Sequence, residues 1–245
     1  MLHGIYGRGR NWLTVARGLV AARPEYACVL LDLPHHGESG PGSGGMTVRG
    51  IAADVAVWLD EQDIAPNVLL GHSLGGKVVL AMADQWRDRE LQVWVVDSTP
   101  DTREQSGSAW DLLQTVRGLP ARFASRDEAV SLLTGSGWND GLAQWMTTNL
   151  IREGEGFVWR LDFEVMTRLL DDFVTTDLWA VVEQRAAGHT IHFIKATRSN
   201  VLSTDAVRRA RAAHPTRVHV HHLEGSHWIH AEHPDEVVAL LVREL

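Results

Sequence analysis

The stretch at residues 68–77 reads Val-Leu-Leu-Gly-His-Ser-Leu-Gly-Gly-Lys. Its apolar start is typical of a buried strand, and the residues after Lys77 are compatible with a helix. Between them lies Gly-x-Ser-x-Gly, with a glycine on each side of the serine because a β-carbon there would collide with the neighbouring backbone. A strand, a sharp turn and a helix expose the serine hydroxyl at the edge of a sheet, so we predict that Ser73 is a nucleophile.

A serine nucleophile needs a base to accept its proton, and the base needs a carboxylate to orient it. At a strand–turn–helix junction of this kind the order along the chain is serine, acid, histidine. His227 fits best, because it lies late in the chain, in a short loop after a predicted strand at residues 217–222. We therefore predict His227 as the general base.

Two carboxylates are candidates for the acid. The usual loop, after the predicted strand at residues 190–195, contains none between Ala196 and Leu202. Asp205 comes later, in Ser-Thr-Asp, which reads as the capped start of a helix. Asp97 ends the next strand after the serine, at the same carboxyl edge of the sheet as Ser73. We favour Asp97 and keep Asp205 as the alternative; Asp97 could otherwise serve to cap the turn at residues 98–100.

The negative charge that develops on the substrate oxygen needs hydrogen-bond donors. The backbone N–H of Leu74 is one candidate, because it follows the nucleophile directly. The second donor in such folds comes from a loop after a neighbouring strand, and the N–H of Ile5, just after His3-Gly4, is the best candidate.

Strand and helix signals alternate over residues 1–100 and again over residues 186–245. Apolar runs predict strands at 27–32, 68–70, 92–97, 190–195 and 217–222, and helical spacing predicts helices at 11–22, after Thr47, and at 73–86, 205–213 and 234–245. This alternation predicts an α/β fold with a mostly parallel sheet flanked by helices.

The alternation is interrupted between residues 101 and 185. Only helices are predicted there, at residues 110–117, 126–133, 142–151 and 163–173. Five of the ten tryptophans are found in this segment, and four of them, Trp110, Trp138, Trp145 and Trp159, are concentrated between residues 110 and 159. Such residues either line a substrate pocket or hold a small lobe together. We therefore divide the chain into a core, residues 1–100 and 186–245, and a helical cap, residues 101–185.

Composition excludes several classes of protein. A net charge of −8 without a basic run argues against a nucleic-acid partner, and no apolar run approaches the length of a membrane helix. No signal peptide is recognisable, and the single cysteine, Cys28, favours a reducing cytosol. We expect a cytoplasmic monomer or weak homodimer.

Metal chemistry is not expected. His219 and His221 would face the same side of a strand, a spacing that can suit a metal, although packed or solvated strand residues are the commoner outcome. His72 is expected to shape the turn around the serine. The predicted mechanism requires neither a metal nor an organic cofactor.

Several stretches together resemble the α/β-hydrolase superfamily, and within it the small bacterial esterases related to mitochondrial abhydrolases. They are residues 3–7, His-Gly-Ile-Tyr-Gly; 32–39, Asp-Leu-Pro-His-His-Gly-Glu-Ser; 71–77; 96–100, Val-Asp-Ser-Thr-Pro; 159–162, Trp-Arg-Leu-Asp; and 225–232, Gly-Ser-His-Trp-Ile-His-Ala-Glu. The resemblance spans nearly the whole chain and implies a triad of Ser73, Asp97 and His227. It also implies an oxyanion hole of Ile5 and Leu74, and an acid that follows strand six.

The chain departs from this group at its start. Relatives carry one or more strands before the His-Gly loop, whereas only Met1 and Leu2 precede His3 here. An open position in the sheet would leave buried backbone groups unpaired. We expect that the natural reading frame begins upstream, or that the chain is less stable than its relatives.

The leading interpretation is hydrolysis of a small-molecule carboxylic ester or thioester through an acyl-serine intermediate, with a mainly apolar acyl pocket under the cap. Two alternatives stay open. One is a carbon–carbon bond hydrolase or a lyase that uses a similar triad. The other is a catalytically inactive protein of the same fold that binds a ligand.

Overall fold

A four-stranded parallel sheet forms the centre of the molecule. The computed structural model describes residues 1–184 and 188–245. The strands lie in the order β1 (Val68–His72), β2 (Leu91–Val96), β6 (His189–Ala196) and β7 (Val218–Leu223), and each neighbouring pair is parallel. The apolar runs of the sequence become strands buried on both faces, as helices on both sides of a parallel sheet require.

Helices cover the two faces of the sheet with separate apolar clusters. The first cluster joins β2 and β6 to α2 (Val48–Glu61), α3 (Leu74–Gln85) and α9 (Thr204–Ala213). The second joins the opposite faces of β1, β2 and β6 to α1 (Leu13–Ala22), α10 (Ile229–Glu232) and α11 (Pro234–Glu244), with the 3₁₀ turn Gly9–Trp12 before α1. Thr47 caps α2 as predicted, because its hydroxyl accepts the N–H of Gly50 at 2.9 Å. The predicted α/β class is confirmed.

The strand predicted at residues 27–32 is wrong. Only Leu31 of that run forms a bridge, with Leu2, which in turn bridges Gly71 of β1. Leu2 donates to Leu70 O at 2.8 Å and accepts from His72 N at 3.0 Å, so it occupies the place beside β1 that a longer strand would fill. Met1 also contacts this run: Leu31 N donates to Met1 O at 3.3 Å, and the Met1 amino group donates to Val29 O at 2.8 Å.

The prediction of an all-helical segment after β2 is also wrong. The segment contains α4 (Ser108–Gly118), α5 (Arg126–Gly135), α6 (Asp140–Thr147), α7 (Phe163–Thr175) and α8 (Trp179–Gln184). It also contains an antiparallel sheet in the order β3 (Arg122–Phe123), β5 (Gly156–Trp159), β4 (Leu150–Glu153). The predicted helix at 142–151 therefore ends at Thr147, and its last residues belong to β4. Gly154, with φ of 60°, lies in the turn between β4 and β5.

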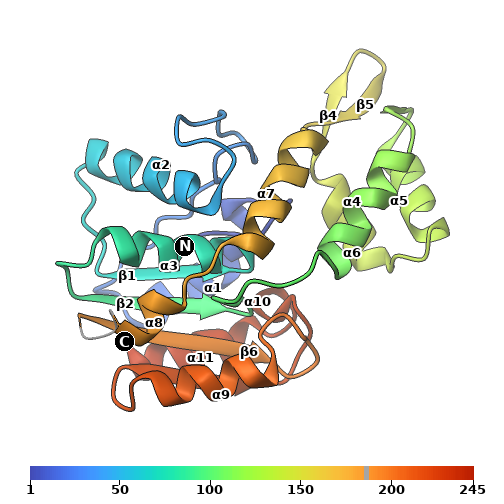
Figure 1. Cartoon of the computed structure of the whole chain (residues 1–245). Coiled ribbons are helices and arrows are strands. Elements are labelled where there is room, and N and C mark those ends of the chain that lie inside the picture. The colour runs from blue at the N-terminus through green and yellow to red at the C-terminus, as the bar shows by residue number, and fades with distance from the viewer. Residues whose placement is uncertain (185–187) are drawn as a thin grey trace.

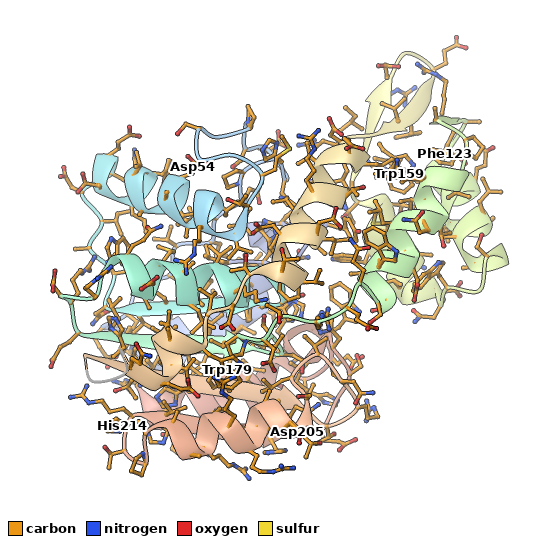
Figure 2. All side chains as sticks on the ribbon, viewed as in Figure 1. Asp54, Phe123, Trp159, Trp179, Asp205 and His214 are labelled. Atoms are coloured by element: carbon orange, nitrogen blue, oxygen red, sulfur yellow. The ribbon has the colours of Figure 1, made fainter. Side chains whose placement is uncertain are left out.

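Part of this segment forms an outer lobe that stands away from the sheet. Figure 1 shows α4, α5, α6, β4 and β5 in the lobe, while α7 leads back to the core. In Figure 2, Phe123 and Trp159 lie close together there, with ring centroids 5.6 Å apart in an edge-on arrangement. α8 packs against α3 and α9 rather than in the lobe. The boundary that we place between residues 185 and 186 lies outside the described residues.

One buried lysine links the core to both ends of this segment. The ammonium of Lys77, on α3, donates to Asp101 O at 2.8 Å and also to Phe173 O. Burial, with the nearby charge of Arg103, lowers the pKa of Lys77 to about 8. The Lys77 side chain is fully buried. Its two hydrogen bonds hold the segment against α3 at Asp101, where the segment begins, and at Phe173, in the helix that returns to the core. In the part of the chain that the structure describes, no helix has the length and apolar character to cross a membrane.

Candidate active site

Ser73 lies in a strained turn between β1 and α3. Its φ of 51° and ψ of −115° fall in a region that residues with a side chain rarely adopt. A β-carbon on Gly71 would lie 2.0 Å from Gly75 O, and one on Gly75 would lie 2.6 Å from His3 O. Only glycine therefore fits at these two positions, as the Gly-x-Ser-x-Gly pattern indicates. Ser73 N donates to Val96 O at 3.0 Å, which holds the turn against the end of β2.

The His3-Gly4 loop passes directly beside the serine. A β-carbon on Gly4 would lie 3.1 Å from Ser73 Cβ, so the two backbones are in close contact. Ile5, which follows Gly4, lines a small cavity together with Ser73 and Leu74. Within residues 1–184 and 188–245, no protein acceptor is recorded for the N–H of Ile5 or of Leu74. The two donors predicted for an oxyanion hole thus border the same space as the hydroxyl.

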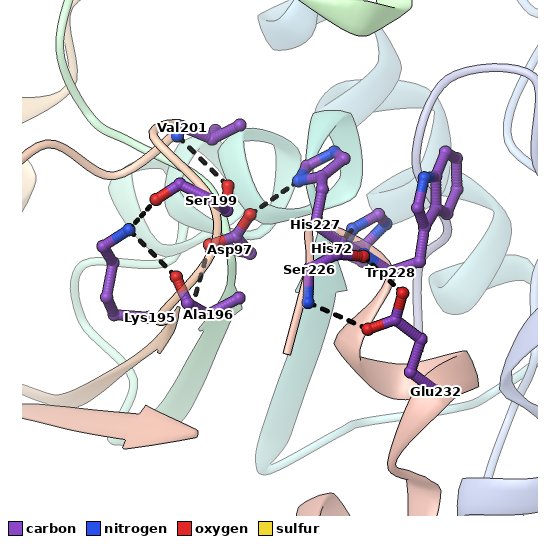
Figure 3. A network of polar contacts seen from close by, with 10 residues as sticks. All are labelled: His72, Asp97, Lys195, Ala196, Ser199, Val201, Ser226, His227, Trp228 and Glu232. Atoms are coloured by element: carbon purple, nitrogen blue, oxygen red, sulfur yellow. Dashed lines mark hydrogen bonds and ion pairs between the residues drawn. The ribbon is translucent and has the colours of Figure 1, made fainter. Parts of the chain in front are cut away.

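Asp97 and His227 form a hydrogen-bonded pair at the same rim (Figure 3). His227 Nδ1 lies 2.6 Å from Asp97 Oδ2, and the other oxygen, Oδ1, accepts the N–H of Ala196 at 3.1 Å. The Asp97 side chain is fully buried at the end of β2. A carboxylate can only accept, so the Nδ1 atom of His227 carries a proton, and in the neutral ring the Nε2 atom then has the lone pair. This arrangement leaves the ring able to take a proton at Nε2.

Asp205 does not take part in this arrangement. It lies in the first turn of α9, with its side chain 85% exposed, and it accepts a hydrogen bond from Arg208 at 2.8 Å. Figure 2 shows Asp205 on the outer surface of the core. Of the two candidate acids, the structure brings only Asp97 to His227.

The imidazole of His227 and the hydroxyl of Ser73 border a common space. Both residues line two small cavities, of about 20 and 50 Å³, and His227 also lines a larger cavity of about 800 Å³. Among the described residues, no hydrogen bond between Ser73 Oγ and His227 is recorded. Bonds of this type are often long before substrate binds and tighten in the complex.

Two contacts that sequence patterns did not reveal hold the His227 loop in place. His72 Nε2 donates to His227 O at 2.7 Å, so the residue before the nucleophile fixes the backbone of the base. Glu232 accepts from both the backbone N–H and the hydroxyl of Ser226 (Figure 3). These bonds join residues of different elements, so their pairing could not be recognised from spacing along the chain.

The larger cavity lies between the core and the outer lobe. Three tryptophans line it, Trp138 and Trp145 from the lobe and Trp228 beside the histidine. Arg103 lines both this cavity and the 50 Å³ cavity that contains Ser73. The guanidinium lies over the ring of Phe173 at 5.3 Å, and its buried Nε atom has no hydrogen-bond partner among the described residues. The 50 Å³ space beside the serine is thus mostly apolar with Arg103 as a positive group, which sequence reasoning missed, while Arg198 lines only the larger cavity.

Four fully buried histidines surround the site and make the fold sensitive to acid. Burial lowers the pKa of His3 and His72 well below the usual value, that of His36 to about 4 and that of His230 to about 3. Below pH 6.5 these histidines therefore bind protons in the unfolded chain but stay neutral in the folded chain. Their effect is that the free energy of unfolding is highest above pH 6.5 and decreases as the pH falls towards 4.

Urea unfolding at pH 7.5, 6.5 and 5.5 measures this effect. Each such histidine contributes up to about 1.4 kcal/mol per pH unit. We expect the free energy of unfolding to fall by several kcal/mol between pH 6.5 and 5.5. An unchanged free energy over this interval would contradict the burial of neutral histidines.

The fold agrees with the comparison to known families. The sequence model described as "Alpha/beta hydrolase family" matches residues 1–240. The chain therefore belongs to the alpha/beta hydrolase family.

Individual relatives carry esterase and lipase names. The chain is 29% identical over 239 residues to the sn-1-specific diacylglycerol lipase ABHD11 of Xenopus laevis, a match that covers 95% of this chain and 74% of the relative. It is 27% identical over 248 residues to the esterase YbfF of Escherichia coli, covering 100% of this chain and 91% of that protein. A solved structure titled "Marine microorganism esterase" has a TM-score of 0.86 at 19% identity, covering 100% of this chain and 93% of that one, and shares the fold. These relatives confirm the predicted resemblance and support a hydrolase.

Proposed function

We propose that this protein hydrolyses carboxylic esters through a covalent acyl-serine intermediate. The observation that carries the proposal is the 2.6 Å bond between Asp97 and His227, formed beside the cavity that Ser73, Ile5 and Leu74 also line. The esterase and lipase names of the relatives support the same class of reaction. Thioesters are included, because the same attack on the carbonyl carbon applies to them.

The proposed reaction begins with attack by Ser73 Oγ on the carbonyl carbon. The hydroxyl proton passes to His227 Nε2, and Asp97 stabilises the imidazolium through Nδ1–H. The negative oxygen of the tetrahedral intermediate accepts from the N–H groups of Leu74 and Ile5, where one such donor is worth roughly 3–4 kcal/mol of the barrier. The intermediate collapses, His227 gives its proton to the leaving alkoxide or thiolate, and the acyl group stays on Ser73. A water molecule, deprotonated by His227, then releases the acid.

The cavities bear on the proposed substrate. Three tryptophans favour an apolar group in the 800 Å³ cavity, which is large enough for a drug-sized small molecule. Arg103 offers a positive charge beside Ser73. A substrate panel should therefore vary acyl length and should include an acyl chain that ends in a carboxylate. We further propose that the protein is cytoplasmic and is a monomer or a weak homodimer.

A fluorophosphonate probe tests the proposed nucleophile directly. We expect the intact mass of the chain to rise by one phosphonyl group, with the adduct on the peptide that contains Ser73, because phosphonates react with serines activated by a histidine. Prior incubation with an excess of a short-chain p-nitrophenyl ester should slow the labelling.

The Asp97→Asn variant is the control, since it keeps Ser73 but should lose activation. Labelling of both proteins at the same rate, or adducts on several serines, would contradict an activated Ser73. An inactive ligand-binding protein would not be labelled at all.

A further inference from the structure

A second group of polar side chains lies on the far face of the sheet from α3. Within residues 1–184 and 188–245, one group of three residues could hold a metal ion: His192 of β6, His221 of β7 and Glu244 at the end of α11. One donor atom from each lies within 4.8 Å of the other two. None of these residues lines the cavities that contain Ser73 or His227. The group is therefore separate from the proposed active site.

Aromatic stacking fixes the orientation of the two imidazoles. The His192 ring stacks on Trp94 with centroids 4.1 Å apart and an angle of 14°, and the His192 and His221 rings are nearly parallel, at 4°. His192 is almost fully buried, whereas His221 and Glu244 are partly exposed. The donors are thus held in place on the inner side and open to solvent on the outer side. A metal site needs both a rigid ligand set and a path of entry.

The distances suit a transition metal bound by nitrogen and oxygen. His192 Nδ1 and His221 Nε2 lie 3.0 Å apart. Two ligands of a tetrahedral zinc ion, each bonded at about 2.0–2.1 Å, lie about 3.4 Å apart, so a shift of a few tenths of an ångström accommodates the pair. The Glu244 carboxylate has a side chain 28% exposed and accepts from Arg243 Nε at 2.9 Å, so its movement towards the nitrogens exchanges a solvent-exposed ion pair for the metal ion.

We propose that His192, His221 and Glu244 form a binding site for a transition-metal ion, best suited to Zn²⁺. Two imidazoles and one carboxylate are a common ligand set for zinc with a fourth position open to water. The ion would connect β6, β7 and α11, three elements that carry residues far apart in the sequence. Its role is to stabilise this edge of the fold, not to take part in ester hydrolysis.

Binding changes the hydrogen bonds of the group in a defined way. At present one nitrogen of the His192–His221 pair donates to the other, and Gln92 Nε2 lies 3.2 Å from His192 Nε2 while it donates to Glu244 O at 2.9 Å. The His192 Nδ1 atom must lose its proton to bind the ion, and Nε2 gains one. The Gln92 amide must then turn so that its oxygen accepts from Nε2, as the outer nitrogen of a metal-bound histidine requires. No net proton is released.

Isothermal titration of the tag-free chain of residues 1–245 with ZnCl₂ tests the proposal, and the visible spectrum with Co²⁺ reports the coordination. We expect one ion per chain and, at a hundredfold excess over the dissociation constant, a melting temperature raised by roughly 5 to 10 °C. The His221→Gln and Glu244→Gln variants should bind at least about tenfold more weakly. Glu244 lies at the end of the last helix, so its variant should fold even if the other does not.

His219→Gln is the matched control. His219 stacks on His192 with centroids 4.9 Å apart but is not one of the three donors, so this variant should keep the wild-type affinity. A wild-type chain that binds no ion overturns the proposal, and so does equal affinity in the Glu244→Gln variant. Binding that survives both ligand variants but is lost in Asp97→Asn would place the ion at the active site instead and would also overturn it.

Discussion

The Ser73→Ala variant is expected to hydrolyse p-nitrophenyl esters at least about 10⁴-fold more slowly than the wild type. In the proposed mechanism alanine removes the atom that would carry the acyl group, while the Asp97–His227 pair and both N–H donors stay in place. The loss should appear in kcat, because the substrate cavity is not altered. Initial rates over a panel of acyl lengths measure it.

The fold of this variant should be preserved, since Ser73 Oγ has no recorded hydrogen bond among the described residues. Ser131→Ala is the matched control, because Ser131 is exposed on α5, away from the cavities. It should retain the wild-type rate. If Ser73→Ala and the wild type hydrolyse esters equally, the serine is not the nucleophile, and a ligand-binding role becomes the better interpretation.

Replacing Asp97 with asparagine should also lower kcat by about 10⁴-fold. The buried Oδ1 atom accepts the N–H of Ala196, so an asparagine would keep its oxygen there and point its NH₂ group at His227 Nδ1. The ring would then have to accept at Nδ1 and carry its proton on Nε2. In that tautomer His227 cannot take the proton of Ser73.

Asparagine is well suited to this test, because Asp97 has a φ of 42° and asparagine tolerates this conformation better than most residues do. Asp205→Asn is the control. Because Asp205 is exposed and pairs only with Arg208 among the described residues, its variant should keep the wild-type rate. A large loss in Asp205→Asn with none in Asp97→Asn would reverse the assignment of the acid.

The local chemistry of the chain made much of the fold predictable. The strand before Ser73 and the glycines on each side of it indicate a sharp turn, because a β-carbon at Gly71 or Gly75 would overlap neighbouring backbone atoms. The apolar runs at β1, β2 and β6 could be recognised as strands because both faces of the sheet are covered. The same signal misled at residues 27–32, because the apolar run there forms a single bridge, from Leu31 to Leu2, and no ladder.

The β-hairpin of the outer lobe was missed for a different reason. Residues 142–151 have helical spacing, but β4 pairs with β5 around Gly154, and Trp159 packs edge-on against Phe123. These contacts outweigh the local preference for a helix. A turn with Gly154 and Gly156 between β-forming residues was the available signal.

At the site, the strand end pointed to Asp97 and the late loop pointed to His227, and the structure brings both together. The contacts that support them could not be read from the sequence. The bond from His72 to the carbonyl of His227 spans 155 positions, and the exposure of Arg103 to the serine cavity depends on how the segment after β2 folds back. Such contacts depend on tertiary packing and leave no periodic pattern.

The left-handed backbone at Ser73 has a consequence for directed evolution. A conformation of this kind costs about 1–3 kcal/mol for any residue with a side chain, and glycine alone adopts it freely. A library sorted only for heat resistance would therefore enrich glycine at position 73 and lose the proposed nucleophile. Selection for thermal tolerance in this protein needs a simultaneous assay of turnover.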